Sequence, residues 1–164
     1  MCAYRRYGCL PSNPSVSRTD WPPDGKEIAL YSRVQDKSQI FVIGADATGL
    51  RQITSGEANH FFPMWSKDGR WIYFSSNTPL AGGEEVQVIP SVHLHNFDIV
   101  SDGIYFLATA STLKFLNTAG QITTVAPQLP QGYVGLSVSP DKKSILFTAD
   151  KPQTSELVLV ENFQ

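Results

Sequence analysis

A short motif recurs four times along the chain, and it constrains the fold more than any other feature of the sequence. Each copy places an aspartate in a stretch typical of a tight turn and follows it with aliphatic and aromatic residues. The four copies are residues 21–32 (WPPDGKEIALYS), 65–76 (WSKDGRWIYFSS), 100–107 (VSDGIYFL) and 138–148 (VSPDKKSILFT). Their aspartates, which lie 44, 34 and 39 residues apart, are Asp24, Asp68, Asp102 and Asp141. Self-similarity at such intervals indicates one structural unit that is repeated along the chain.

Each copy predicts a hairpin turn that leads into a strand. In such a turn, aspartate can accept hydrogen bonds from the backbone amides that follow it, and glycine adopts the positive φ angle that the turn requires. The glycines at this position are Gly25, Gly69 and Gly103. The fourth copy has Lys142 instead, at a cost of about 1 kcal/mol if its φ angle is positive.

The apolar runs predict an all-β fold. The strands of the motif itself lie near residues 28–31, 72–74, 104–106 and 145–147, and further strands are expected at 39–43, 50–54, 113–116, 122–125 and 157–160. Short runs rich in β-branched and aromatic residues fit strands that are covered on both faces. No window long enough for a helix keeps the i, i+3, i+4, i+7 apolar spacing without a glycine or proline.

Composition narrows the class of protein. At roughly 150 residues per domain, 164 residues allow one domain, and 41% hydrophobic residues supply a core, which argues against a disordered chain. The net charge of −2 lacks the basic excess that phosphate contacts need. No apolar run approaches the roughly 18 residues that cross a bilayer. We therefore expect no direct contact with nucleic acid and no membrane segment in this chain.

The first 20 residues are expected to form a loose tail. Its two cysteines, Cys2 and Cys9, are the only ones in the chain, and they make neither a disulfide framework nor a C-x-x-C metal motif. Free thiols and a local disulfide both stay open. Arg5 and Arg6 are not followed by an apolar segment, so we expect no signal peptide.

Residues 65–77 resemble the W-S-P-D-G-x-x-I-x-F signature of TolB-type β-propellers, a family of WD-like repeats. Residues 39–54 resemble the remainder of one such blade, and the likeness is clear over 21–77 and moderate over 97–163. It implies four-stranded blades and a periplasmic or extracytoplasmic location. Residues 156–163 resemble the carboxy-terminal ending of propellers in acidobacterial winged-helix regulators. In those regulators a DNA-binding domain, usually with a membrane helix, precedes the propeller.

The chain departs from this family after Asn77. Family blades continue with a third strand there, whereas residues 78–88 read TPLAGGEEVQV. We therefore expect a partial propeller of about three to four blades, near 21–54, 65–90, 97–125 and 134–163, that is open or truncated and is a fragment of a longer one. An open propeller has an unpaired edge strand, through which the chain could associate with itself.

No sequence motif indicates catalysis or a bound cofactor. The chain lacks a G-x-S-x-G elbow and the glycine-rich phosphate loops, although a Ser–His–Asp set that includes one of the three histidines stays open. His93 and His95 would share one face of a strand, with Asp98 nearby, so these three residues are weak candidates for a metal site. We favour the simpler interpretation that the histidines are partly exposed at a blade edge.

The remaining conspicuous residues are interpreted as structural. The four repeated aspartates recur one per blade, which favours a role in the turns over a shared carboxylate site. Trp21 and Trp65 occupy equivalent positions, which favours packing between blades over ligand stacking. His60, which precedes an aromatic run, is expected to cap the entry to a strand.

Three functional hypotheses follow. The first is a non-enzymatic scaffold whose loops, or whose edge strand, bind a protein or peptide partner. The second, implied by the resemblance, is the extracytoplasmic sensor portion of a membrane-bound winged-helix transcription regulator. The third is the accessory propeller of a hydrolase.

Overall fold

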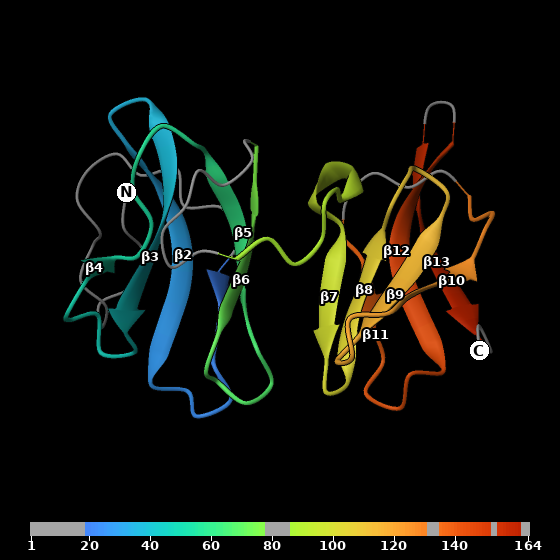
Figure 1. Ribbon diagram of the computed structural model, residues 1–164, viewed down its shortest axis with the longest axis horizontal. Helices are drawn as coiled ribbons and strands as arrows, with labels where there is room; N and C mark the ends of the chain where they lie inside the picture. Colours follow the sequence, from blue (N-terminus) through green and yellow to red (C-terminus); the bar gives the residue numbers. More distant parts are fainter. Residues whose placement is uncertain (1–18, 78–85, 131–134, 152–153, 162–164) are drawn as a thin grey trace. The chain divides into compact units, whose positions relative to one another are not determined.

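The computed structural model describes residues 19–77, 86–130, 135–151 and 154–161, and side chains only as far as Thr148. The chain divides into two compact units, Met1–Gln87 and Val88–Gln164. Strands make up nearly all of the regular structure in both units (Figure 1). The all-β fold class is therefore confirmed. Cys2, Cys9 and most of the predicted tail lie outside the described residues.

The first unit begins with a four-stranded antiparallel sheet, called sheet A here. Its strands are β1 (Thr19–Asp20), β2 (Glu27–Val34), β3 (Lys37–Gly44) and β4 (Arg51–Gln52), in the order β1-β2-β3-β4. The long β2–β3 hairpin pairs Glu27 with Gly44 at one end and Val34 with Lys37 at the other. Ala29, Ile40 and Val42 are completely buried in it.

The second sheet of this unit, sheet B, has two described strands. They are β5 (His60–Trp65) and β6 (Ile72–Ser76), and they pair antiparallel. An extra residue in β5 shifts the register between Phe61 and Met64. Phe62, which lies in this bulge, has a φ angle of 53°. The bulge bends β5 and leaves β6 regular.

The second unit contains sheets C and D. Sheet C is a four-stranded antiparallel sheet in the order β10-β9-β8-β7, with β7 (Phe97–Val100), β8 (Gly103–Leu107), β9 (Leu113–Asn117) and β10 (Ile122–Ala126). Sheet D has the order β11-β12-β13, with β11 (Ser137–Val138), β12 (Ser144–Lys151) and β13 (Thr154–Glu161). A single 3₁₀ turn, η1 (His93–His95), precedes β7.

One core joins sheets C and D within the second unit. It consists of buried side chains from β8, β9, β12 and the segment before β11: Tyr105, Leu107, Leu113, Leu136, Ile145 and Phe147. The rings of Tyr105 and Phe115 pack at 4.5 Å between centroids. The motif strands β8 and β12 therefore supply much of this core, as their apolar character predicts.

The predicted strands are present with small differences in length. Only Arg51 and Gln52 of the expected strand 50–54 are in a strand, and β5 begins at His60, ahead of the predicted start of the second blade. The expectation that His93 and His95 lie on a strand is wrong. They lie in η1, where Leu94 and His95 both have positive φ angles, a backbone conformation outside that of a regular strand.

Gly103 does not have the positive φ angle expected of it. Its motif copy turns within two residues, Ser101 and Asp102, so that Val100 pairs with Gly103 and the glycine is already in β8. Glycine is needed there for another reason. A Cβ atom at this position would overlap the backbone carbonyl oxygen of Leu116 and lie 2.7 Å from the ring of Phe115.

We expect Gly103→Ala to lower the free energy of unfolding by at least about 3 kcal/mol, because a carbonyl oxygen in a strand cannot move aside without distorting the β8–β9 ladder. Gly120→Ala is the matched control. Gly120 has a φ angle of 80°, and a Cβ atom added there would have no neighbouring atom within 4 Å, so this variant loses only about 1 kcal/mol from its strained backbone. Urea unfolding of both variants measures the difference, and equal losses would contradict this account.

Candidate functional site

Three of the four motif turns share one set of hydrogen bonds. In each, a backbone amide donates to the aspartate Oδ1 at 3.1 Å: Lys26 to Asp24, Arg70 to Asp68 and Lys143 to Asp141. A second backbone amide in each turn donates a hydrogen bond of 2.9–3.0 Å to the carbonyl oxygen three residues earlier: Gly25 to Pro22, Gly69 to Ser66 and Lys142 to Ser139. The residues that donate this second bond have left-handed φ angles of 65°, 69° and 58°. Lys142 therefore adopts the strained conformation for which the other copies use glycine.

A serine completes the network in the second and fourth copies. Ser66 Oγ donates to Asp68 Oδ1 at 2.5 Å, and Ser139 Oγ donates to Asp141 Oδ1 at 2.6 Å. These hydroxyl bonds, together with the backbone amide bonds, hold the pKa values of both carboxyl groups below their usual range. Each aspartate is thus satisfied by its own turn.

The third copy is different because its aspartate contacts a neighbouring turn. Lys142 Nζ lies 2.6 Å from Asp102 Oδ1, which joins the turn of sheet D to that of sheet C. The ion pair is partly exposed, so its contribution to stability is small.

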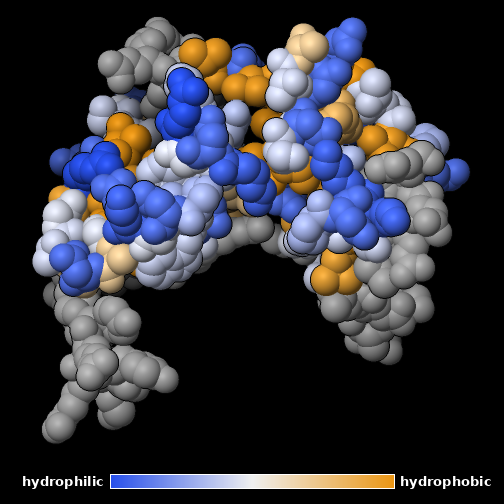
Figure 2. All heavy atoms as spheres, turned by 90° about the horizontal axis from the view of Figure 1, so that it is seen from below, coloured by the Kyte–Doolittle hydropathy of each residue, from blue (hydrophilic) through white to orange (hydrophobic). Residues whose placement is uncertain are grey.

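Within each unit, taken by itself, the two motif turns lie at the same end of its sheets (Figure 1). Seen from below, this end is covered mainly by hydrophilic residues (Figure 2). Lys26, Lys67, Arg70 and Lys143 are among the residues of these turns. This end of each unit is therefore solvated and polar.

The two equivalent tryptophans differ in their surroundings. Trp21 is 53% exposed, whereas Trp65 is half-buried, and its Nε1 atom has no hydrogen-bond partner among the described residues. Trp71, which follows the turn of sheet B, is 60% exposed. The sequence offers no signal for this difference, because the exposure depends on which sheet lies alongside.

The weak metal candidates are not assembled into a site. Asp98 lies in β7 and accepts hydrogen bonds from the amides of Val138 and Ile99, at 2.7 and 2.9 Å. His93 and His95 lie on η1, where burial lowers the pKa of His95. Across the described ranges of the chain, no three histidine, cysteine, aspartate or glutamate residues are grouped as metal ligands.

The bond from Val138 to Asp98 has a counterpart in the first unit. There the amide of Trp65 donates to Asp20 Oδ2 at 2.6 Å. Asp20 and Asp98 both lie four residues before a turn aspartate, and Trp65 and Val138 both lie three residues before one. The same carboxylate-to-backbone bond therefore joins sheet A to sheet B and sheet C to sheet D. The signal that could have revealed this role is the shared spacing of Asp20 and Asp98 within the repeat.

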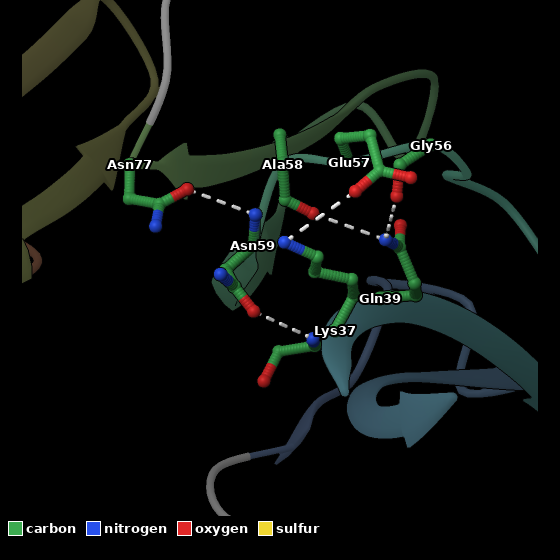
Figure 3. A network of polar contacts seen from close by, with 8 residues as sticks. Lys37, Gln39, Gly56, Glu57, Ala58, Asn59 and Asn77 are labelled. Carbon is green, nitrogen blue, oxygen red and sulfur yellow. Dashed lines mark hydrogen bonds and ion pairs between the residues drawn. The ribbon is translucent and has the colours of Figure 1, made fainter. Parts of the chain in front are cut away.

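Polar residues join sheets A and B at the opposite end of the first unit (Figure 3). Asn59 Oδ1 accepts a hydrogen bond from the backbone N–H of Ser38 at 2.9 Å, and the backbone N–H of Asn59 donates one to Asn77 Oδ1 at 2.8 Å. Gln39 is 2% exposed and donates to the carbonyls of Gly56 and Ala58. These bonds hold the start of β5 and the chain just after β6 against β3.

His60, which the sequence places at the entry to a strand, lies within this region. It is the first residue of β5, is 1% exposed and packs edge-on against Phe74, with ring centroids 5.0 Å apart. Its place in the sheet is therefore that of a core residue. An aromatic run after a histidine does not reveal this, since burial depends on the facing strand.

The outer edge of β6 is the candidate functional site. In the other sheets the motif strand is paired on both sides: β2 by β1 and β3, β8 by β7 and β9, and β12 by β11 and β13. Among the described strands, β6 pairs with β5 only. Ile72, Tyr73 and Phe74 are partly exposed, whereas their counterparts Ile104, Tyr105 and Phe106 are at most 6% exposed. An edge strand with partly uncovered apolar side chains can accept another strand.

The chain matches no protein-family model. Over 58 residues it is 38% identical to an uncharacterised protein of Agrobacterium fabrum, covering 35% of this chain and 20% of that protein. Over 68 residues it is 34% identical to dipeptidyl-peptidase 5 of Porphyromonas gingivalis, covering 38% of this chain and 10% of the peptidase. The chain therefore aligns with a minor part of each curated relative.

Two solved structures share the fold. TolB from Acinetobacter baumannii has a TM-score of 0.63 and 11% identity, over 88% of this chain and 40% of that chain. Puromycin hydrolase has a TM-score of 0.64 and 16% identity, over 89% of this chain and 27% of the hydrolase. Identities this low indicate the fold alone. The protein has the fold of a partial β-propeller of the TolB type, and the resemblance seen in its sequence motif is confirmed at that level.

We expect Asp98→Ala to lower the free energy of unfolding by about 2–4 kcal/mol, because two backbone amides lose a charged acceptor in a buried place. Asp98→Asn keeps one side-chain oxygen and should lose less. Asp36→Ala is the control, since Asp36 is exposed in the β2–β3 turn and its removal should change stability by less than about 0.5 kcal/mol. Equal unfolding energies for Asp98→Ala and Asp36→Ala would refute the structural role of Asp98.

The carboxylates of the motif turns make the free energy of unfolding depend on pH. The pKa values of Asp68 and Asp141 are lower in the folded chain than the ordinary value of 3.8, so their contribution is present above that value and is lost as the pH falls through the folded pKa. Ser66→Ala with Ser139→Ala removes the main cause of the shift. Urea unfolding between about pH 2.5 and 6 should show a smaller acid-induced loss in the double variant; an unchanged pH profile would contradict this assignment.

Proposed function

We propose that this protein is a non-enzymatic propeller scaffold that binds a protein or peptide segment in extended conformation. The observation that supports it is the edge of β6, which no other described strand pairs. The backbone of such an edge presents N–H and C=O groups in a row, and a partner strand can satisfy them by β-augmentation. We further propose, from the resemblance to TolB-type propellers alone, a periplasmic or extracytoplasmic location.

The chemistry of the edge defines the partner. Residues 72–76 (IYFSS) carry no charge, and the side chains of Ile72, Tyr73 and Phe74 are partly exposed. Since successive side chains of a strand point to opposite faces, an added strand gains apolar contacts on both faces of sheet B. The partner is therefore a segment rich in β-branched or aromatic residues, without proline at its centre.

A role as the accessory propeller of a hydrolase is the second candidate, and the comparisons favour it. The structural likeness to puromycin hydrolase and the sequence likeness to dipeptidyl-peptidase 5 each cover a minor part of those proteins. In that role the β6 edge binds a segment of the hydrolase. The sensor role in a winged-helix regulator is supported only by the resemblance of residues 156–163.

The proposal is tested with peptides selected from a displayed random library against the whole chain. We expect alternating apolar sequences, whose binding slows amide hydrogen exchange over residues 72–76 and leaves the outer edge strand β10 unaffected. N-methylation of every second peptide amide should weaken binding by about tenfold or more for one of the two alternating sets only. Selected peptides that leave exchange over 72–76 unchanged, or whose two methylated sets behave alike, would refute edge pairing.

A further inference from the structure

We infer that Asp24 is a modification site, where the chain forms isoaspartate spontaneously and ahead of its other Asp-Gly pairs. The sequence contains three such pairs, at residues 24–25, 68–69 and 102–103. An aspartate followed by glycine is prone to this reaction, because glycine has no side chain to hinder its amide nitrogen. The inference does not depend on the β6 edge.

The reaction needs water and no other reagent. The backbone nitrogen of Gly25 attacks Cγ of the protonated Asp24 carboxyl group, and an N–Cγ bond closes a five-membered succinimide ring. The water that leaves takes its oxygen and one hydrogen from the carboxyl group and its other hydrogen from the amide. Water then adds to the ring, at Cγ to restore aspartate or at the backbone carbonyl carbon to give isoaspartate. One water is lost and one is gained, so the mass is unchanged.

The second turn restrains its aspartate through a serine. Ser66 Oγ donates to Asp68 Oδ1 at 2.5 Å and accepts the backbone N–H of Arg70 at 3.1 Å. The same hydroxyl oxygen accepts the backbone N–H of Trp71 at 3.0 Å. The carboxyl group must leave its serine before Cγ can face the nitrogen of Gly69. Because a hydrogen bond to a charged group is stronger than a neutral one, this restraint slows ring closure by about tenfold.

The first turn lacks this restraint, because Pro22 stands where the second turn has Ser66. Among the described residues, Asp24 accepts a 3.1 Å bond from the backbone N–H of Lys26 and forms a loose ion pair with Lys26 Nζ at 3.8 Å. The Asp24 side chain is 58% exposed. The carboxyl group can therefore turn toward the nitrogen of Gly25, and water reaches the ring.

The third Asp-Gly pair is held by its strand and by a neighbouring turn. Gly103 is already paired with Val100 in the β7–β8 ladder, which fixes the backbone that must rotate for ring closure. Asp102 Oδ1 also forms the 2.6 Å ion pair with Lys142 Nζ. Ring closure at this position therefore breaks both a strand pairing and an ion pair.

Isoaspartate at residue 24 changes the entry to sheet A. Its main chain is longer by one carbon, and its carboxylate is attached directly to Cα. The turn bond from Lys26 is thereby lost, immediately before β2 begins at Glu27. The exposed carboxylate that results is the group that protein-isoaspartate methyltransferases esterify, and such an enzyme is the partner that recognises the modified turn.

The inference is tested by keeping the whole folded chain in warm neutral buffer for several weeks and mapping its peptides by mass spectrometry. Isoaspartyl peptides have the mass of the aspartyl peptides but elute separately, and endoproteinase Asp-N does not cleave at them. We expect isoaspartate to accumulate at residue 24 about tenfold faster than at residue 68. Methyl transfer by an isoaspartate methyltransferase should label the same peptide. Equal rates at the two positions would overturn the inference.

The chain unfolded in guanidinium chloride is the matched control, because both Asp-Gly pairs are followed by a basic residue, Lys26 or Arg70. Without the folded turns the two rates should agree within about twofold. A tenfold difference that persists in the unfolded chain would assign the effect to the local sequence and overturn the role of the fold.

Exchanging the serine tests the cause of the difference. Ser66→Ala should raise the rate at Asp68 by about tenfold and leave the rate at Asp24 unchanged. Pro22→Ser places a hydroxyl group at the equivalent position of the first turn and should slow the reaction at Asp24. Circular dichroism identifies the variants that stay folded. A folded Ser66→Ala chain that keeps the low rate at Asp68 would contradict the protective role of the serine.

Discussion

A carboxylate that accepts a main-chain N–H from the next sheet holds the sheets of each unit together. Asp20 does this for Trp65, and Asp98 does it for Val138. Ladder hydrogen bonds act only within a sheet, so side chains must attach one sheet to its neighbour. Apolar packing supplies most of the attraction but little direction. A short charged hydrogen bond to one particular amide fixes the position of the neighbouring strand. The remaining contacts between the sheets depend on that position.

The edge of β6 follows from this arrangement. The bond from Trp65 holds the end of β5, and Asn59 and Gln39 hold its beginning against β3. Sheet B is thus fixed at both ends against sheet A, while the far side of β6 has no described partner strand. The proposed binding edge is a property of strand pairing and not of a distinctive side chain. This is why no motif in the sequence indicates it.

Local chemistry accounts for the parts of the fold that could be predicted. The Asp-Gly turns and the apolar runs after them predict the hairpins correctly, because both signals act between residues a few positions apart. Gly103 fails the pattern because a two-residue turn moves it into the strand, where it is needed for its lack of a side chain. The prediction of a strand at His93 and His95 fails because alternating spacing over three residues also fits a turn. For Asp98, a carboxylate near two histidines suggests a metal, whereas its bond to the distant amide of Val138 is indicated only by the spacing that Asp98 shares with Asp20 within the repeat.

The sequence by itself determined that the chain is all-β, that one turn-and-strand motif is repeated four times, and that this motif resembles the repeat of TolB-type propellers. Only the tertiary structure decided which strands are neighbours, which carboxylates join the sheets, and which edge stays without a described partner. The physical reason is the separation along the chain. Turn bonds join residues two to five positions apart, whereas the two carboxylate bonds between sheets join residues 45 and 40 positions apart. A pattern read over a few residues contains the first kind of interaction and not the second.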